Sequence, residues 1–104
     1  MQQAVIVHLA LREGEFGSSQ EFDTMIALQE RLMQAIEAAS VGELDGNELG
    51  GGAFAIFMYG PDADRLFAVV EPLLKATPAA AGGHAVKRYG DVDDPNARAV
   101  RVTW

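Results

Sequence analysis

A run of apolar residues near the middle of the chain constrains its fold more than any other feature. Ala53 to Tyr59 reads AFAIFMY, and its only polar side-chain atom is the tyrosine hydroxyl. Turn formers bound the run, with Gly50 to Gly52 before it and Gly60-Pro61 after it. A short, continuous apolar run between turn signals is typical of a strand that is buried on both faces. We therefore predict that residues 53–59 form a strand in the middle of a sheet.

Residues 3–11 predict a second central strand. Alternate positions form two sets, Val5, Val7, Leu9 and Leu11 on one face and Ala4, Ile6, His8 and Ala10 on the other. Both sets are largely apolar, which is again typical of a strand covered on both sides. Three further strands are predicted over 41–48, 84–89 and 98–104, and the first of these forms a hairpin with 53–59. Asp45-Gly46, inside that first strand, indicates a turn or a bulge.

Two helices are predicted between these strands. Ser18 and Glu21 have the spacing of a capping box, and apolar residues then recur at helical intervals, so we predict a helix over 19–39. The second helix has its apolar stripe at Leu66, Phe67, Val70, Leu73 and Leu74. Pro72 lies within this stripe. Because proline removes a backbone hydrogen bond, we expect a kink or an early end of the helix there.

The elements follow the order β-α-β-β-α-β with one additional C-terminal strand. This order resembles that of the ferredoxin-like superfold of small domains, in which two helices cover one face of an antiparallel sheet. The resemblance covers nearly the whole chain and rests on topology, since no sequence motif marks it. It implies an α+β, two-layer sandwich with both helices on one face. The length of 104 residues predicts a single α+β domain over 1–104.

Composition narrows the classes of function. The chain has 8 Lys and Arg against 15 Asp and Glu, a net charge of −7, so its surface repels nucleic-acid phosphates and anionic lipids. We therefore expect no nucleic-acid and no membrane partner. The first apolar run is too short for a membrane span, and there is no cysteine, which together indicate a soluble cytoplasmic protein. No cofactor-binding motif is present and two histidines are too few for a structural zinc site, so we expect neither a cofactor nor a metal.

One segment comes close to the third-strand motif of RNA-recognition domains, which share the same element order. Residues 50–57 supply the glycine, alanine and aromatic positions of that motif. However, Gly50 stands where the motif has a basic residue, and Gly52 stands where it has its principal stacking ring. Ile6 occupies the place of the second stacking ring on the first strand. RNA binding is therefore not expected.

Candidate catalytic residues are few. His8 and His84 are the only side chains whose ordinary pKa lies near neutral pH. As an enzyme, the chain would use His8 as acid or base in a cleft, with Tyr59 or Arg88 orienting the substrate. The alternative is that His8 is a packed strand residue, which is the commoner role of a histidine on an apolar strand. No nucleophile, metal set or cofactor set accompanies these residues, which favours a non-catalytic protein.

Half of the basic residues lie in the last eighteen positions, namely Lys87, Arg88, Arg98 and Arg101. If strands 84–89 and 98–104 pair as a hairpin, these side chains form a local basic patch on an acidic protein. Such a patch would bind a small anionic ligand or an acidic partner surface. Alternatively, the four side chains form exposed ion pairs with Asp91, Asp93 or a neighbouring strand, which contribute little stability.

The sheet face opposite the helices is the remaining candidate site. Ala4, Ile6 and Ala10 lie on it, with either Phe54, Ile56 and Met58 or Ala53, Ala55, Phe57 and Tyr59, and we expect Val100, Val102 and Trp104 to extend it. A large exposed apolar patch on a small protein usually marks an interface, so we predict a homodimer formed by sheet-to-sheet packing, as in ferredoxin-like domains. The favoured function is a dimeric binding or regulatory module. The alternatives are a small enzyme that uses His8, and an acidic protein that neutralises a basic partner.

Overall fold

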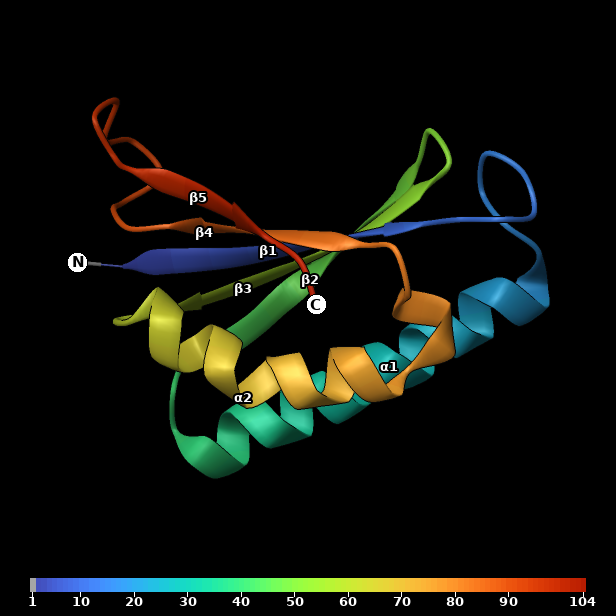
Figure 1. Cartoon of the computed structure of the whole chain (residues 1–104), viewed down its shortest axis with the longest axis horizontal. Coiled ribbons are helices and arrows are strands. Elements are labelled where there is room, and N and C mark those ends of the chain that lie inside the picture. Colours follow the sequence, from blue (N-terminus) through green and yellow to red (C-terminus); the bar gives the residue numbers. More distant parts are fainter. Residues whose placement is uncertain (1) are drawn as a thin grey trace.

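In the computed structural model, residues 2–104 are described, and they form a five-stranded antiparallel sheet with two helices on one of its faces (Figure 1). The strands are β1 (Gln3–Ala10), β2 (Glu43–Gly50), β3 (Ala53–Gly60), β4 (His84–Arg88) and β5 (Ala99–Val102). The helices are α1 (Ser19–Ala39) and α2 (Ala63–Ala76), and a short 3-10 helix, η1 (Pro78–Ala80), precedes β4. The α+β class, the β-α-β-β-α-β order and the additional C-terminal strand are confirmed.

The strand order is β2-β3-β1-β4-β5, and every neighbouring pair is antiparallel. Helix α1 connects β1 to β2 with β3 between them, and α2 connects β3 to β4 with β1 between them. The two crossovers therefore interlock, and β1 and β3 become interior strands while β2 and β5 form the edges. This explains why the two most apolar segments of the sequence are β1 and β3.

The hydrophobic core lies between the helices and one face of the sheet. Val5, Val7 and Leu9 of β1 point into it, and their partners on β3 are Met58, Ile56 and Phe54. The helices contribute Met25, Leu28, Leu32, Ile36, Leu66, Val70 and Leu74, all at most 1% exposed. Since side chains alternate along a strand, Ala53, Ala55, Phe57 and Tyr59 lie on the opposite face, which we call the open face. Of the two sets that the sequence left open, this is the one that faces away from the helices.

The C-terminal strand places its apolar residues differently from the expectation. Val100 pairs with Lys87 and Val102 with Ala85, on the helix side of β4, and Trp104 packs against the core. The indole Nε1 of Trp104 donates a hydrogen bond to the carbonyl of Ala80, at 3.0 Å. These three residues therefore do not extend the open face. The register of β5 on β4, which no local pattern encodes, sets their direction.

Helix α1 begins and ends where the sequence predicts. Ser18 Oγ accepts a hydrogen bond from the amide of Glu21, at 3.0 Å, as a capping box requires. The carboxylate of Glu21 does not return to Ser18; it accepts the amides of Arg12 and Glu13 instead and so fastens the loop before the helix. Within residues 2–104, no helix is long and apolar enough to cross a lipid bilayer.

Helix α2 continues past Pro72 to Ala76, so of the two outcomes expected at this proline, a kink or an early end, the early end is wrong. Proline at this position leaves the carbonyl of Ala68 without its helical donor. Both Pro72 and Ala68 are exposed, which lets water hydrogen-bond to that carbonyl. The packing of the apolar stripe then stabilises one further turn of the helix.

The hairpin of β2 and β3 turns at Gly51 and Gly52, whose φ angles are 61° and 77°. Two successive residues with positive φ define the type I′ turn, which suits the twist of a two-residue hairpin and favours glycine. The predicted irregularity at Asp45-Gly46 is a β-bulge, because Leu44 pairs with Met58 and Gly46 with Phe57. The bulge places an additional residue, Asp45, on the exposed edge strand.

Candidate functional site

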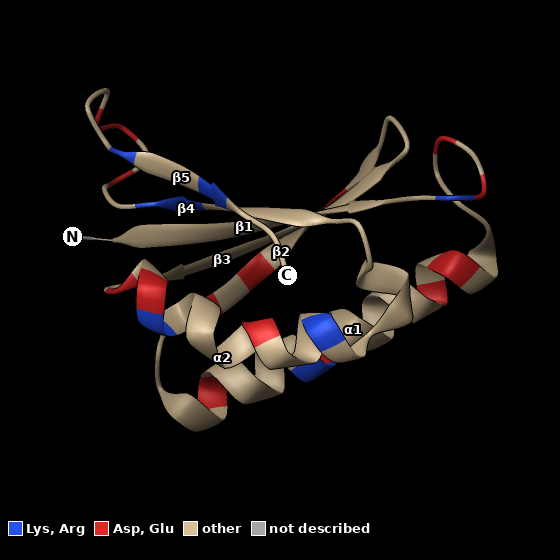
Figure 2. Cartoon of the chain, in the orientation of Figure 1, with Lys and Arg blue, Asp and Glu red and all other residues tan. Residues whose placement is uncertain are grey.

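The open face is organised in rows of side chains that run across the sheet. From β2 to β5 the first row contains Glu43, Tyr59, Ala4, Arg88 and Ala99; the second contains Gly46, Phe57, Ile6, Val86 and Arg101; the third contains Glu48, Ala55, His8 and His84. Side chains in one row are neighbours on the same face. Carboxylates therefore lie along the β2 edge, apolar residues in the middle, and guanidinium groups on β4 and β5. Figure 2 shows this separation of charge, with basic segments on β4 and β5 and acidic segments on β2.

The middle of this face is apolar and uncovered. Ile6, Phe57 and Val86 are half-buried by their neighbours in the sheet, and both helices lie on the other side (Figure 1). Two ends of the face are raised. The β2–β3 hairpin and the loop after β1 rise at one end, and the loop between β4 and β5 rises at the other (Figure 1). The loop after β1 packs beside the hairpin, because the amide of Leu11 donates a hydrogen bond to the carbonyl of Gly52 and the amide of Gly52 donates one to the carbonyl of Glu15. The first raised part therefore lies at the β2–β3 corner and the second at the β4–β5 corner, which are diagonally opposite.

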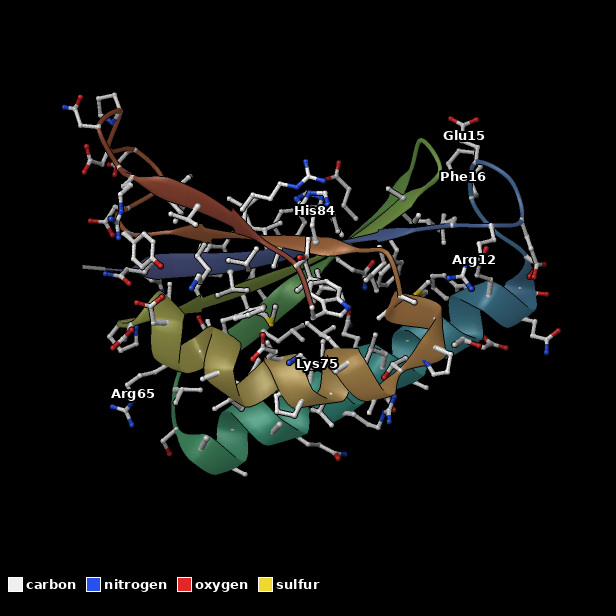
Figure 3. The ribbon with its side chains drawn as sticks, in the orientation of Figure 1. Arg12, Glu15, Phe16, Arg65, Lys75 and His84 are labelled. Carbon is white, nitrogen blue, oxygen red and sulfur yellow. The ribbon has the colours of Figure 1, made fainter. Side chains whose placement is uncertain are left out.

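The two histidines of the chain are direct cross-strand neighbours on this face. His8 pairs with His84 in register, and their rings stack with centroids 4.8 Å apart and planes 19° from parallel. Figure 3 shows His84 projecting from β4 on the side of the sheet away from the helices. Both side chains are partly exposed, and neither ring has a hydrogen-bond partner among residues 2–104. Burial, followed by the charges of Arg101 and His8, lowers the pKa of His84.

A hollow of about 180 Å³ lies beside the histidine pair. It is lined by both histidines, by Leu9 and by residues with small side chains or none, including Ala10, Gly52, Ala53 and Gly83. A second, larger depression of about 550 Å³ lies at the other end of the face, where Tyr59 and Arg88 stand with Glu43, Asp45 and Asp91. The Nε of Arg88 donates a hydrogen bond to the carbonyl of Gly90, at 2.9 Å.

These two hollows separate the residues that an enzyme would need together. Tyr59 and Arg88 share one depression, whereas His8 lines the other. His8 lies four positions along β1 from Ala4, the residue between Tyr59 and Arg88, which corresponds to about 13 Å along a strand. A single small substrate would not contact all three side chains. The geometry does not assemble the cleft that the enzymatic alternative requires.

The four basic residues near the C-terminus divide between the two faces of the sheet. Arg88 and Arg101 belong to the open face, while Lys87 is on the helix side and forms an ion pair with Asp64, with Nζ to Oδ1 at 2.8 Å. The guanidinium of Arg98 lies over the ring of Tyr89, at 4.5 Å from its centroid. The four therefore do not form one patch.

Asp64 is the centre of the cluster on the helix side. Its Oδ1 accepts hydrogen bonds from Lys87 Nζ and from the hydroxyl of Tyr89, the latter at 2.6 Å. The hydrogen bond from Lys87, followed by that from Tyr89, lowers the pKa of Asp64, and the same contact raises the pKa of Lys87. Tyr89 and Asp64 were not among the site residues predicted from the sequence. Side chains alternate along β4, which puts Lys87 and Tyr89 on one face and Arg88 on the other. This alternation is the sequence signal that could have separated Lys87 from Arg88.

The histidine pair can supply two imidazole ligands to a metal ion, one from each ring. Within residues 2–104, no three or more His, Asp or Glu side chains lie close enough together to hold one ion. In the acidic loop after β4, Asp94 Oδ1 accepts a hydrogen bond from the amide of Asn96 within the loop, whereas Asp91 Oδ1 accepts one from the amide of Gln2, just before β1. The open face, with its graded charge and its histidine pair, is the candidate functional surface of this chain.

No protein-family model, curated protein or solved structure matches this chain.

Proposed function

We propose that this protein is a non-catalytic binding or regulatory module that forms a homodimer through the open face of its sheet. The observation that carries the proposal is the order of side chains across that face, with carboxylates on β2, apolar residues in the middle and arginines on β4 and β5. An uncovered apolar patch with charged borders on a small protein is typical of an interface.

The charge order favours a second copy of the chain as the occupant. A two-fold axis that lies between two such sheets and runs parallel to the strands places β2 of one protomer over β5 of its partner. It also places β3 over β4, and β1 over its own copy. The acidic edge of each protomer then faces the basic edge of the other, which steers and orients association. An axis perpendicular to the strands would instead place acidic edges over each other.

The same axis matches individual side chains. Asp45 of one protomer faces Arg101 of the other, Phe57 faces Val86, and Tyr59 faces Arg88, while the small side chain of Ala55 leaves room for His84. The raised corners also fit, because each meets a corner of the partner that has no raised loop (Figure 1). Packed sheets usually cross at about 30°, so the contacts nearest the centre follow this register most closely.

The topology supports this proposal through its resemblance to the ferredoxin-like superfold, whose members dimerise through the uncovered sheet face. We assign the chain to that superfold as part of the proposal. We also place it in the cytoplasm, since the absence of cysteine fits a reducing compartment. A protein or a small anionic ligand that contacts Arg88 and Arg101 would occupy the same face and would therefore compete with the second copy of the chain.

Sedimentation equilibrium and light scattering over a range of protein concentrations test the dimer. Val86→Glu puts a charge in the middle of the open face and should raise the dimer Kd at least tenfold. Val100→Glu makes the same change on the helix side of β5 and serves as its control. Arg101→Glu should also weaken the dimer, and adding Asp45→Arg should restore it. Arg65→Glu, on the exposed side of α2 (Figure 3), has the same charge change and should have no effect.

A chain that stays monomeric at millimolar concentration would overturn the proposal and favour an acidic protein that neutralises a basic partner. A dimer that Val86→Glu leaves intact would show that the interface lies elsewhere. Restoration by Asp45→Arg distinguishes the proposed two-fold axis from any other arrangement of the same faces, because only this axis brings the two positions together.

A further inference from the structure

We propose that His8 and His84 form a two-imidazole site that binds one late first-row divalent ion, Cu²⁺ or Zn²⁺, and leaves its other coordination positions open to water or an external ligand. The site lies on the open face but needs no second copy of the chain. Because the proposed dimer places His84 against Ala55 of the partner protomer, the site is open in the monomer and covered in the dimer.

The geometry of the pair suits chelation. His8 and His84 are paired directly across two interior strands, so the sheet fixes the separation of their backbones. Their rings lie face to face with centroids 4.8 Å apart. In the stacked arrangement the nitrogen lone pairs, which lie in the ring planes, run nearly parallel. Chelation therefore requires both side chains to rotate until one nitrogen of each ring lies at the usual metal–nitrogen distance of about 2.0–2.1 Å from a common point. Two ligands held by one rigid sheet bind an ion more tightly than two independent ones, because the second contact is intramolecular.

The chemistry of the surroundings is consistent with a metal. Neither ring is hydrogen-bonded to another group among residues 2–104, so their nitrogens are available as ligands. Imidazole prefers Zn²⁺, Ni²⁺ and Cu²⁺ over hard cations, and Cu²⁺ is bound most tightly in this series. Apart from Leu9 and the histidines themselves, the hollow beside the pair is lined by glycine and alanine, which leaves space for an ion and its remaining ligands.

One neighbour opposes the binding of a cation. Arg101 is on the same face as His84 and contributes a positive charge to its surroundings. Removing this charge should tighten binding, whereas removing either imidazole should weaken it. The proposal therefore predicts that loss of an imidazole weakens metal binding and that loss of the nearby Arg101 charge strengthens it. Nonspecific attraction of cations to an acidic protein would not make binding depend on the imidazoles.

The test is titration of the metal-free chain with Cu²⁺ and then with Zn²⁺, followed by calorimetry and by the nitrogen hyperfine structure in the Cu²⁺ EPR spectrum. We expect one ion per chain with two bound nitrogens. His8→Ala and His84→Phe should each weaken binding at least tenfold and leave one nitrogen, and Arg101→Gln should strengthen binding severalfold. His84→Phe retains an aromatic ring for stacking, so its effect reports the lost ligand and not lost packing.

The double variant, His8→Ala with His84→Phe, measures binding by carboxylates and by the chain terminus, because the chain contains no other histidine and no cysteine. Circular dichroism of each variant verifies that the fold is retained. If either single variant binds Cu²⁺ as tightly as the wild type, or if the wild-type spectrum shows one nitrogen only, the pair is not a chelate and the proposal is overturned.

Discussion

The two faces of the sheet differ in what explains their residues. Val5, Val7 and Leu9 on the helix side of β1 are at most 1% exposed, and packing against two helices accounts for each of them. On the other side of the same strand, Ile6 and His8 are only half-buried, and no helix covers them. The fold therefore requires apolar residues on the helix side of the sheet. It does not determine which residues occupy the open face. The proposed dimer and the proposed metal site are both on that second face.

The charged residues show the same contrast. Lys87 and Arg88 are adjacent in sequence, but Lys87 is tied to Asp64 on the helix side, whereas Arg88 remains on the open face beside Tyr59 and Asp91. One basic residue contributes to the internal structure, and the next is available to a partner.

The largest expected effect separates two phenylalanines of the same strand. Phe54→Ala empties a fully buried position and should lower the free energy of unfolding by about 3–5 kcal/mol. Phe57→Ala, on the open face, should lower it by about 1 kcal/mol in a monomeric sample. Urea denaturation at several protein concentrations measures both. If the open face is an interface, the effect of Phe57→Ala grows with concentration while that of Phe54→Ala does not; equal growth would remove the distinction between the faces.

A second prediction compares a glycine in crowded surroundings with a glycine that has open space around it. Gly42 has a φ of 150°, and a β-carbon there would overlap the carbonyl oxygen of Tyr59. Gly42→Ala should therefore lower the free energy of unfolding by about 2–3 kcal/mol. Gly46, on the open face, has no atom within 4 Å of such a β-carbon. Gly46→Ala should leave the free energy of unfolding of the monomer almost unchanged, and a large decrease would show that the open face does not tolerate a β-carbon at this position.

The smallest expected effect concerns pH and the helix-side cluster. Because hydrogen bonds lower the pKa of Asp64 in the folded state, its ionised form stabilises the fold at any pH above its unfolded pKa, near 4. This contribution is lost as the pH falls through the still lower folded pKa. Asp64→Asn should thus melt slightly below the wild type at pH 7, with a difference that shrinks as the pH falls below 4. Thermal unfolding followed by circular dichroism measures it, and Tyr89→Phe, which removes one of the two hydrogen bonds, should show part of the effect. A difference that persists unchanged at pH 2.5 would mean that the Asp64 charge is not its cause.

Much of the fold could be predicted because its signals are local. The capping residue Ser18 and the helical spacing after it predict α1 with its observed bounds, and the glycines at 50–52 predict the hairpin that follows β2. The early end at Pro72 failed because a local rule was outweighed by the packing of the whole α2 stripe on the sheet. Val100, Val102 and Trp104 were placed on the wrong face because alternation defines two faces without saying which of them meets the helices.

The site depended on long-range order to a greater degree. The sequence by itself determined the α+β element order, the apolar interior strands and the acidic net charge. Periodicity depends only on residues that are close in the chain, and net charge is a sum over all residues. Only the tertiary structure decided that His8 meets His84, that Lys87 and Arg88 part to opposite faces, and that the carboxylates and arginines of the open face gather at opposite edges. The physical reason is that strand register comes from pairing between segments far apart in the chain, and a shift of one residue would move every side chain of a strand to the other face.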